Sequence, residues 1–243
     1  MTMLPASVIA IAAIAALLIA MGLALGSIDR RNFSLRWLLI AVGFVVINDA
    51  FLINFYGLLP DLIPGSGWNW QGKLIAFAST LLIAAHPAIG WVRSGLTFRQ
   101  RQGSLAGAMT VALLYCGFFL LLASIFPNEA PGKEDVAFQL TMPGFEEEAF
   151  YRGTLLLALN EAFRGRLRAF GIDWGWGALL SCLAFGLAHA FGYSASAGFS
   201  FDAMTMVATS VPSLLAVWLR ERTGSLLFPV ILHNFGNAIM MIL

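Results

Sequence analysis

Residues 105–126 read LAGAMTVALLYCGFFLLLASIF, an apolar run without a charged side chain. A helix needs about 20 such residues to cross the hydrocarbon core of a bilayer, so this run is typical of a membrane span. The whole chain has the same character, because 59% of its 243 residues are hydrophobic and only 11% are charged. A soluble domain has about 25% charged residues, since its surface faces water. The sequence therefore predicts an all-α, polytopic membrane protein.

Further apolar runs on both sides of this one predict a bundle of about eight transmembrane helices. The predicted spans are residues 5–26, 37–59, 74–92, 105–126, 143–163, 175–193, 202–219 and 224–243. The first run exceeds the usual signal-peptide core of about 7–15 residues and its flank has no Lys or Arg, so we interpret it as a retained span. We expect a single transmembrane domain over residues 1–243. Four helices lie in 1–126, and 141–243 contains most of the polar residues within spans.

The basic residues predict the orientation of this bundle. Eleven of the fourteen Lys and Arg fall in or beside the odd-numbered connections between spans, namely Arg30, Arg31, Arg36, Arg93, Arg99, Arg101, Arg164, Arg166, Arg168, Arg220 and Arg222. The even-numbered connections have only Lys73 and Lys133. Cytoplasmic loops are enriched in Lys and Arg, so we expect cytoplasmic odd connections and both termini outside. The net charge of +1 excludes a nucleic-acid binder that works through a basic face.

Ionisable side chains inside a membrane cost at least about 2.5–3.5 kcal/mol at a helix centre, so they indicate function. Here they gather in three late spans, in the patterns Glu146-Glu147-Glu148-x-x-x-Arg152, Phe185-x-x-x-His189 and His233-x-x-x-Asn237. Residues four apart share a helix face, whereas adjacent residues are rotated by about 100°. We therefore expect Glu148 to pair with Arg152 and to leave Glu147 available for chemistry.

Other polar residues in the predicted spans belong to none of these patterns. Asp49, beside Asn48 in the second span, needs a partner or a water-filled cavity that the sequence does not identify. His86 in the third span is interpreted as a hydrogen-bonded packing residue, and Glu146 as a solvated carboxylate at the outer end of the fifth span.

The three polar patterns fall at a similar predicted depth, toward the non-cytoplasmic face. A carboxylate beside an imidazole can deprotonate a water molecule, and a second imidazole with a carboxamide can stabilise an oxyanion. Such a set can hydrolyse a peptide bond without a covalent intermediate. A glutamate and two histidines also suit a zinc ion with an open water position, although the HExxH pattern of zinc proteases is absent. The spacing alone leaves both alternatives open.

Two other functions use the same residue types. A transporter also places Glu, His and Asn within a bundle, but the sequence has neither repeated halves nor a matched pair of broken helices. A non-catalytic membrane protein that binds a partner through buried Glu and His is the remaining alternative. Cleavage that depends on Glu147 would separate a protease from both.

The three patterns, in this order on late spans, resemble the motifs of the CPBP family, the CAAX proteases and bacteriocin-processing enzymes also called Abi or glutamic intramembrane proteases. The resemblance covers about residues 141–243 and implies an intramembrane endopeptidase of eight helices with its active site among the C-terminal helices. It implies Glu147 as the general base and His189 as a residue that helps to hold the water. His233 and Asn237 would stabilise the oxyanion, and Glu148 and Arg152 would support the site. It also implies a mechanism without a metal or other cofactor, with zinc as the alternative.

The family also implies the partners, which are membrane lipid and a protein or peptide substrate. Prenylated substrates of the CAAX branch are cytosolic, whereas the basic residues here predict a site toward the outside. This difference favours a bacterial protein of the inner (plasma) membrane that acts on exported or membrane-anchored peptides. C-terminal sorting tails and bacteriocin-like leader peptides are the expected substrates.

Overall fold

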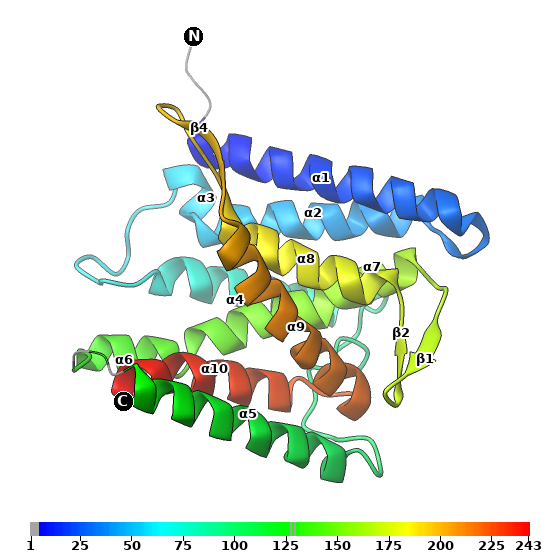
Figure 1. Cartoon of the computed structure of the whole chain (residues 1–243). Helices are drawn as coiled ribbons and strands as arrows, with labels where there is room; N and C mark the ends of the chain where they lie inside the picture. Colours follow the sequence, from blue (N-terminus) through cyan, green and yellow to red (C-terminus); the bar gives the residue numbers. More distant parts are fainter. Residues whose placement is uncertain (1–4, 127, 129) are drawn as a thin grey trace.

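The computed structural model describes residues 5–126, 128 and 130–243. Residues 1–4, which form part of the flank of the first predicted span, lie outside the described residues, as do residues 127 and 129. Figure 1 shows a bundle of helices with two small β-hairpins at its periphery. The predicted fold class, an all-α bundle of a membrane protein, is confirmed, with the two hairpins as the β-structure among the described residues.

The first half of the bundle consists of α1 (Ala6–Ile28), the short helix η1 (Arg30–Asn32), α2 (Leu35–Leu52), α3 (Asn54–Gly57), α4 (Trp70–Ala85) and α5 (Leu105–Ile125). The second half consists of α6 (Lys133–Gln139), the π-helix η2 (Gly144–Leu155) that continues into α7 (Leu156–Ala162), α8 (Trp176–Ala190), α9 (Ala203–Thr223) and α10 (Leu227–Ile242). The predicted spans correspond in order to α1, α2, α4, α5, η2 with α7, α8, α9 and α10.

The lengths and compositions of these helices suit a bilayer. Of the described helices, α1, α2, α5 and α9 are long and apolar enough to cross a membrane, while α4, α8 and α10 are shorter and apolar. The odd-numbered connections, which contain most of the basic residues, lie together at one end of the bundle, on the right in Figure 1. The C-terminus and the beginning of α1 lie at the other end. The chain is thus an integral membrane protein whose connections alternate between two ends.

Two predicted spans end earlier than expected, and both ends have a local cause. Helix α4 stops at Ala85 because Pro87 disfavours a helical conformation at His86, whose ψ is 133°. His86 is exposed and accepts a hydrogen bond from Ala88 N (3.2 Å), so the prediction of a packing residue inside a span was wrong. Helix α2 stops at Leu52, before a bend in which Asn54 has a positive φ of 52°.

The two hairpins follow α7 and α8, and the second begins within the last three residues of the sixth predicted span, 175–193. Strand β1 (Leu167–Ala169) pairs antiparallel with β2 (Ile172–Trp174). Phe170 and Gly171 between them both have positive φ, as a two-residue turn of this kind requires. Strand β3 (Phe191–Ser194) pairs antiparallel with β4 (Gly198–Phe201) and joins α8 to α9.

The segment formed by η2 and α7 occupies the centre of the bundle and is almost fully buried. It contacts α2 and α4 from the first half and α8 and α10 from the second. Gly144 permits the close approach of η2 to α10, because a Cβ there would lie 2.4 Å from Asn234 Oδ1. Gly144 N also donates a hydrogen bond to this oxygen (2.7 Å). The two contacts set the distance across which His233 of α10 faces the glutamates of η2.

Candidate active site

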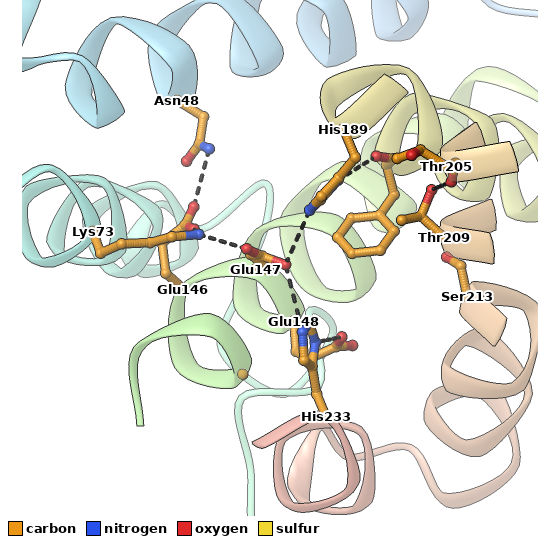
Figure 2. A network of polar contacts seen from close by, with 12 residues as sticks. Asn48, Lys73, Glu146, Glu147, Glu148, His189, Thr205, Thr209, Ser213 and His233 are labelled. Carbon is orange, nitrogen blue, oxygen red and sulfur yellow. Dashed lines mark hydrogen bonds and ion pairs between the residues drawn. The ribbon is translucent and has the colours of Figure 1, made fainter. Parts of the chain in front are cut away.

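Three consecutive glutamates at the beginning of η2 point in three different directions (Figure 2). Glu146 faces α2 and α4, Glu147 faces a cavity between the helices, and Glu148 faces α10. The helix is a π-helix here, with wider turns than the α-helix assumed from the sequence. Short π-helical segments occur frequently at functional sites. Adjacent carboxylates can therefore have entirely different partners.

Glu148 and Arg152 form the pair that their spacing predicts. Glu148 Oε2 lies 3.3 Å from Arg152 Nε, and the two side chains are only 1% and 2% exposed. Arg152 also donates a hydrogen bond to Ser213 Oγ (2.8 Å) and lies over the ring of Phe185, 4.2 Å from its centroid. The guanidinium is therefore held by one carboxylate, one hydroxyl and one aromatic face.

Glu147 lies between one cation and two histidines. Its Oε1 accepts a hydrogen bond from Lys73 Nζ (2.6 Å), and its Oε2 lies 3.6 Å from His233 Nε2 and 4.0 Å from His189 Nε2. The structure thus brings together the three residues for which the sequence predicts catalysis on η2, α8 and α10. The two imidazoles approach the same carboxylate oxygen, and Figure 2 shows them on either side of it.

The hydrogen bonds at Nδ1 determine which ring nitrogens of the two histidines carry a hydrogen. His189 Nδ1 lies 2.8 Å from Phe185 O, and His233 Nδ1 lies 2.7 Å from Glu148 Oε1. A carbonyl oxygen and an ionised carboxylate only accept hydrogen bonds, so Nδ1 donates in both rings. In a neutral imidazole the other nitrogen is then an acceptor. In that neutral form, both Nε2 atoms, which face Glu147, can accept a hydrogen bond from water.

The interpretation of Glu146 as a solvated carboxylate was wrong. Its side chain is fully buried and accepts hydrogen bonds from Asn48 Nδ2 (3.0 Å) and Lys73 Nζ (2.6 Å). Lys73 was assigned to a loop, but it lies in the first turn of α4 and its side chain is only 14% exposed. No local spacing could reveal these contacts, because the partners are 98 and 73 residues apart. Among the described residues, Asp49 Oδ2 is buried without a hydrogen-bond partner.

A cavity of about 640 Å³ opens beside these side chains. Its polar lining includes all six predicted site residues, namely Glu147, Glu148, Arg152, His189, His233 and Asn237. Asn237 lies one turn beyond His233 on α10 and faces the same cavity. The remaining lining is mostly apolar, from Phe119, Phe138, Leu215 and Leu232 among others. A mainly apolar cavity with a few convergent polar groups is the usual form of a ligand site.

Zinc is the alternative that the sequence leaves open for this site. In residues 5–126, 128 and 130–243, no group of three or more His, Cys, Asp or Glu side chains is arranged to hold a metal ion. The expectation of a site without a metal stays a prediction.

Comparison with known proteins identifies the part of the chain that contains this site. Residues 135–239 match the family model described as type II CAAX prenyl endopeptidase Rce1-like. No curated protein and no solved structure matches the chain. The matched range includes η2, α8 and the part of α10 up to residue 239, and with them all six predicted site residues. It excludes Asn48 and Lys73. Residues 135–239 are thus similar to the Rce1-like family of type II CAAX prenyl endopeptidases, and this match agrees with the family resemblance of the three motifs.

Proposed function

We propose that the protein is an intramembrane endopeptidase in which Glu147 activates a water molecule for attack on a peptide bond. The observation that carries this proposal is the position of Glu147 Oε2. It faces His189 Nε2 and His233 Nε2 at 4.0 and 3.6 Å, beside the cavity. These distances are too short for a water between the atoms, but a water in the adjoining cavity can lie beside them within hydrogen-bond distance of Oε2 and Nε2.

In the proposed reaction, Glu147 takes a proton from a water molecule that also donates a hydrogen bond to His189 Nε2. The water oxygen attacks the carbonyl carbon of the substrate, and the carbonyl oxygen becomes an oxyanion. The carbon–nitrogen bond then breaks, and the proton held by Glu147 moves to the leaving amine. General base catalysis of this kind contributes a factor of about 10²–10⁴ in rate.

The oxyanion needs hydrogen-bond donors, and Asn237 and His233 are the candidates on α10. The carboxamide of Asn237 is a donor in any protonation state, whereas His233 Nε2 donates only when the ring is an imidazolium. His233 Nδ1 lies 2.7 Å from Glu148 Oε1, so Glu148 orients the His233 ring, and the ring lines the cavity.

The substrate is proposed to be a membrane-anchored or exported peptide, such as a C-terminal sorting tail or a leader peptide. Lys73 and Glu147 lie near the beginnings of α4 and η2, toward the end of the bundle where α10 ends. The basic connections lie at the opposite end, which is the cytoplasmic one by the distribution of Arg. These positions support a site toward the non-cytoplasmic face of a bacterial inner membrane, with both termini outside.

Cleavage of a library of peptides with transmembrane tails by the purified protein in detergent tests this proposal. Wild type, Glu147→Gln and His233→Ala are compared with and without a chelator, and Glu161→Gln serves as the control. Glu161 forms an ion pair with Arg93 at the opposite end of the bundle. We expect chelator-resistant cleavage that both site variants lose and the control retains.

Other outcomes would favour the alternatives. Cleavage that a chelator abolishes and zinc restores would replace the glutamate mechanism with a metal mechanism. Equal cleavage by wild type and Glu147→Gln would overturn the role of Glu147. Solute movement without cleavage would indicate a transporter, and specific binding of a partner without either activity would indicate a binding protein.

A further inference from the structure

Two residues from the first half of the chain contact the glutamates of η2, although neither belongs to the matched range 135–239. Asn48 is in the last turns of α2, and Lys73 is in the first turn of α4. Figure 2 shows both side chains reaching toward η2 from the side opposite His233. The described part of the site therefore has polar contributions from both halves of the chain.

Lys73 connects two carboxylates with very different exposure. Its Nζ donates hydrogen bonds to Glu146 Oε2 and to Glu147 Oε1, both at 2.6 Å. Glu146 is fully buried, whereas the Glu147 side chain is 12% exposed and lines the cavity. One ammonium group thus connects two carboxylates. The carboxylate of Glu146 is out of reach of a ligand in the cavity, and that of Glu147 lies at the cavity wall.

Glu146 provides the fixed end of this connection. Its Oε1 accepts a hydrogen bond from Asn48 Nδ2 (3.0 Å), so each of its two oxygens has a donor. A buried carboxylate is tolerated when it is paired and hydrogen-bonded, and it then restrains its partners. The lysine stem by itself is long and flexible. Because Glu146 holds the ammonium, Lys73 can present a fixed donor to Glu147.

The backbone around Lys73 is also held close to α2. Asn69 accepts a hydrogen bond from Gly72 N (3.0 Å) and donates one to Leu52 O (2.8 Å), so it caps α4 and attaches it to the end of α2. A Cβ at Gly72 would lie only 2.1 Å from Leu52 O, so this contact requires glycine. The first turn of α4 is therefore fixed one residue before Lys73.

We infer that Asn48, Glu146 and Lys73 are positioning residues that hold Glu147 Oε1, so that Oε2 faces the two histidines and the cavity. The inference rests on the proposed function, in which Glu147 is the general base. A carboxylate that is fixed at one oxygen offers the other oxygen in a single orientation. Misplacement of a reacting group by about 1 Å can lower a rate by about 10²-fold.

The competing explanation is that Lys73 only neutralises the buried Glu146. The double variant Lys73→Met/Glu146→Gln distinguishes the two explanations, because it removes both charges and leaves no uncompensated carboxylate at position 146. Asn48 can still donate a hydrogen bond to the glutamine carbonyl. If Lys73 serves Glu146 alone, this variant should fold and cleave like wild type.

We expect the double variant to fold but to lose about 10- to 100-fold in kcat, with little change in KM. Lys73 Nζ contacts Glu147 directly at 2.6 Å, whereas Glu146 is joined to Glu147 through Lys73, so the loss of the cation outweighs the loss of the Glu146 carboxylate. The acid limb of the pH profile of kcat/KM should therefore move to higher pH. Other charged or titratable groups near Glu147 are retained in this variant. Among the described residues they include His189 on α8, His233 on α10, and Glu148, Tyr151 and Arg152 on η2. Lys73→Arg keeps the cation and should recover part of kcat.

Lys133→Met is the matched control, since Lys133 is exposed on α6 and is the other lysine of the chain. It should retain the activity and the pH profile of wild type. A double variant with wild-type kcat and an unchanged acid limb would overturn the inference. A change confined to KM would also overturn it, because it would assign Lys73 to substrate binding.

A second measurement keeps the inference testable if the purified protein cleaves no peptide. In the Glu146→Gln background, Lys73→Met and Glu147→Gln are combined in a double-mutant cycle, and Tm is measured in detergent. Non-additive shifts in Tm are expected if Lys73 holds Glu147, and additive shifts would overturn this. Cleavage that survives Glu147→Gln would overturn the proposed function, whereas an additive cycle would overturn only the positioning role.

Discussion

Glu147 lies between two ion pairs, each formed by a buried glutamate and a cation. The two pairs differ in how far the cation is exposed. On the α10 side, Glu148 and Arg152 are 1% and 2% exposed and form a sealed ion pair. On the α4 side, Glu146 is equally buried, but its cation Lys73 is 14% exposed. Glu148, Arg152 and Lys73 all line the cavity, so the difference between the two sides is the exposure of the cation. The pair of Glu148 and Arg152 is linked to Glu147 through His233. Lys73 contacts directly the carboxylate that we propose reacts.

Among the substitutions considered, removal of Arg152 should cause the largest loss of stability, because it disrupts the buried pair with Glu148. Arg152→Met leaves the buried Glu148 without its cation, which typically costs about 3–5 kcal/mol. Unfolding in mixed detergents should show this loss, and Arg152→Met/Glu148→Gln should recover much of it. An unchanged unfolding transition in Arg152→Met would show that Glu148 finds another partner and that the two sides do not differ as described.

The two histidines have different partners, so we expect their substitution to lower kcat by different factors. His233 contacts both Glu147 and Glu148, whereas His189 contacts Glu147 at 4.0 Å and is 37% exposed. We expect His233→Ala to lower kcat by about 10²-fold or more, because it removes the proposed oxyanion donor. His189→Ala should lower kcat less. Steady-state cleavage by the two variants at equal folded fraction measures this, and the reverse order would contradict the assigned roles.

Substitution of Asn48 weakens the pair of Glu146 and Lys73 without removing a charge. Asn48→Ala deletes the hydrogen bond to Glu146 Oε1, and a hydrogen bond to a charged group contributes about 1.5–3 kcal/mol. We expect a loss of stability in this range, smaller than that of Arg152→Met, and a modest loss of kcat. Asn32→Ala is the control, because the Asn32 side chain binds Asp29 at an exposed site. Equal unfolding of Asn48→Ala and the control would remove Asn48 from the network.

The smallest effect is expected at the surface, where α6 contacts the turn before α4. Hydrogen bonds from the Ser66 hydroxyl, Gly67 N–H and Trp70 Nε1 hold the pKa of Glu134 below its ordinary value. A lowered pKa means that the contact is complete above the ordinary pKa and is lost as the pH falls through the lowered one.

Hydrogen exchange of the α6 amides measures this contact. Exchange should accelerate at acid pH in wild type, relative to Glu134→Gln at the same pH, since glutamine cannot titrate. Cleavage and global stability should change little, because Glu134 does not contact Glu147. Identical pH dependence in the two proteins would exclude Glu134 as the group that holds α6.

Several features could be predicted because they depend on neighbours along the chain. The apolar runs predicted the helices in the correct order, and the spacing of Glu148 and Arg152 predicted their ion pair. The three motifs predicted a resemblance to the family whose model residues 135–239 match. The early end of α4 had a visible signal in Pro87, whereas the π-helical turns of η2 had none that we identified. The roles of the site residues, the orientation in the membrane and the substrate stay predictions.

The sequence by itself determined that the chain is a helical membrane protein, which polar groups lie within its spans, and which pairs share a helix face. These properties follow from composition and from helical periodicity, both of which are local. Only the tertiary structure decided that Glu146 is buried and that Lys73 reaches Glu147. Both depend on α2 and α4 packing against η2, across 98 and 74 residues of sequence. Charges that appear as loop residues along the chain become a buried network because helix packing, rather than sequence position, sets their distance from water.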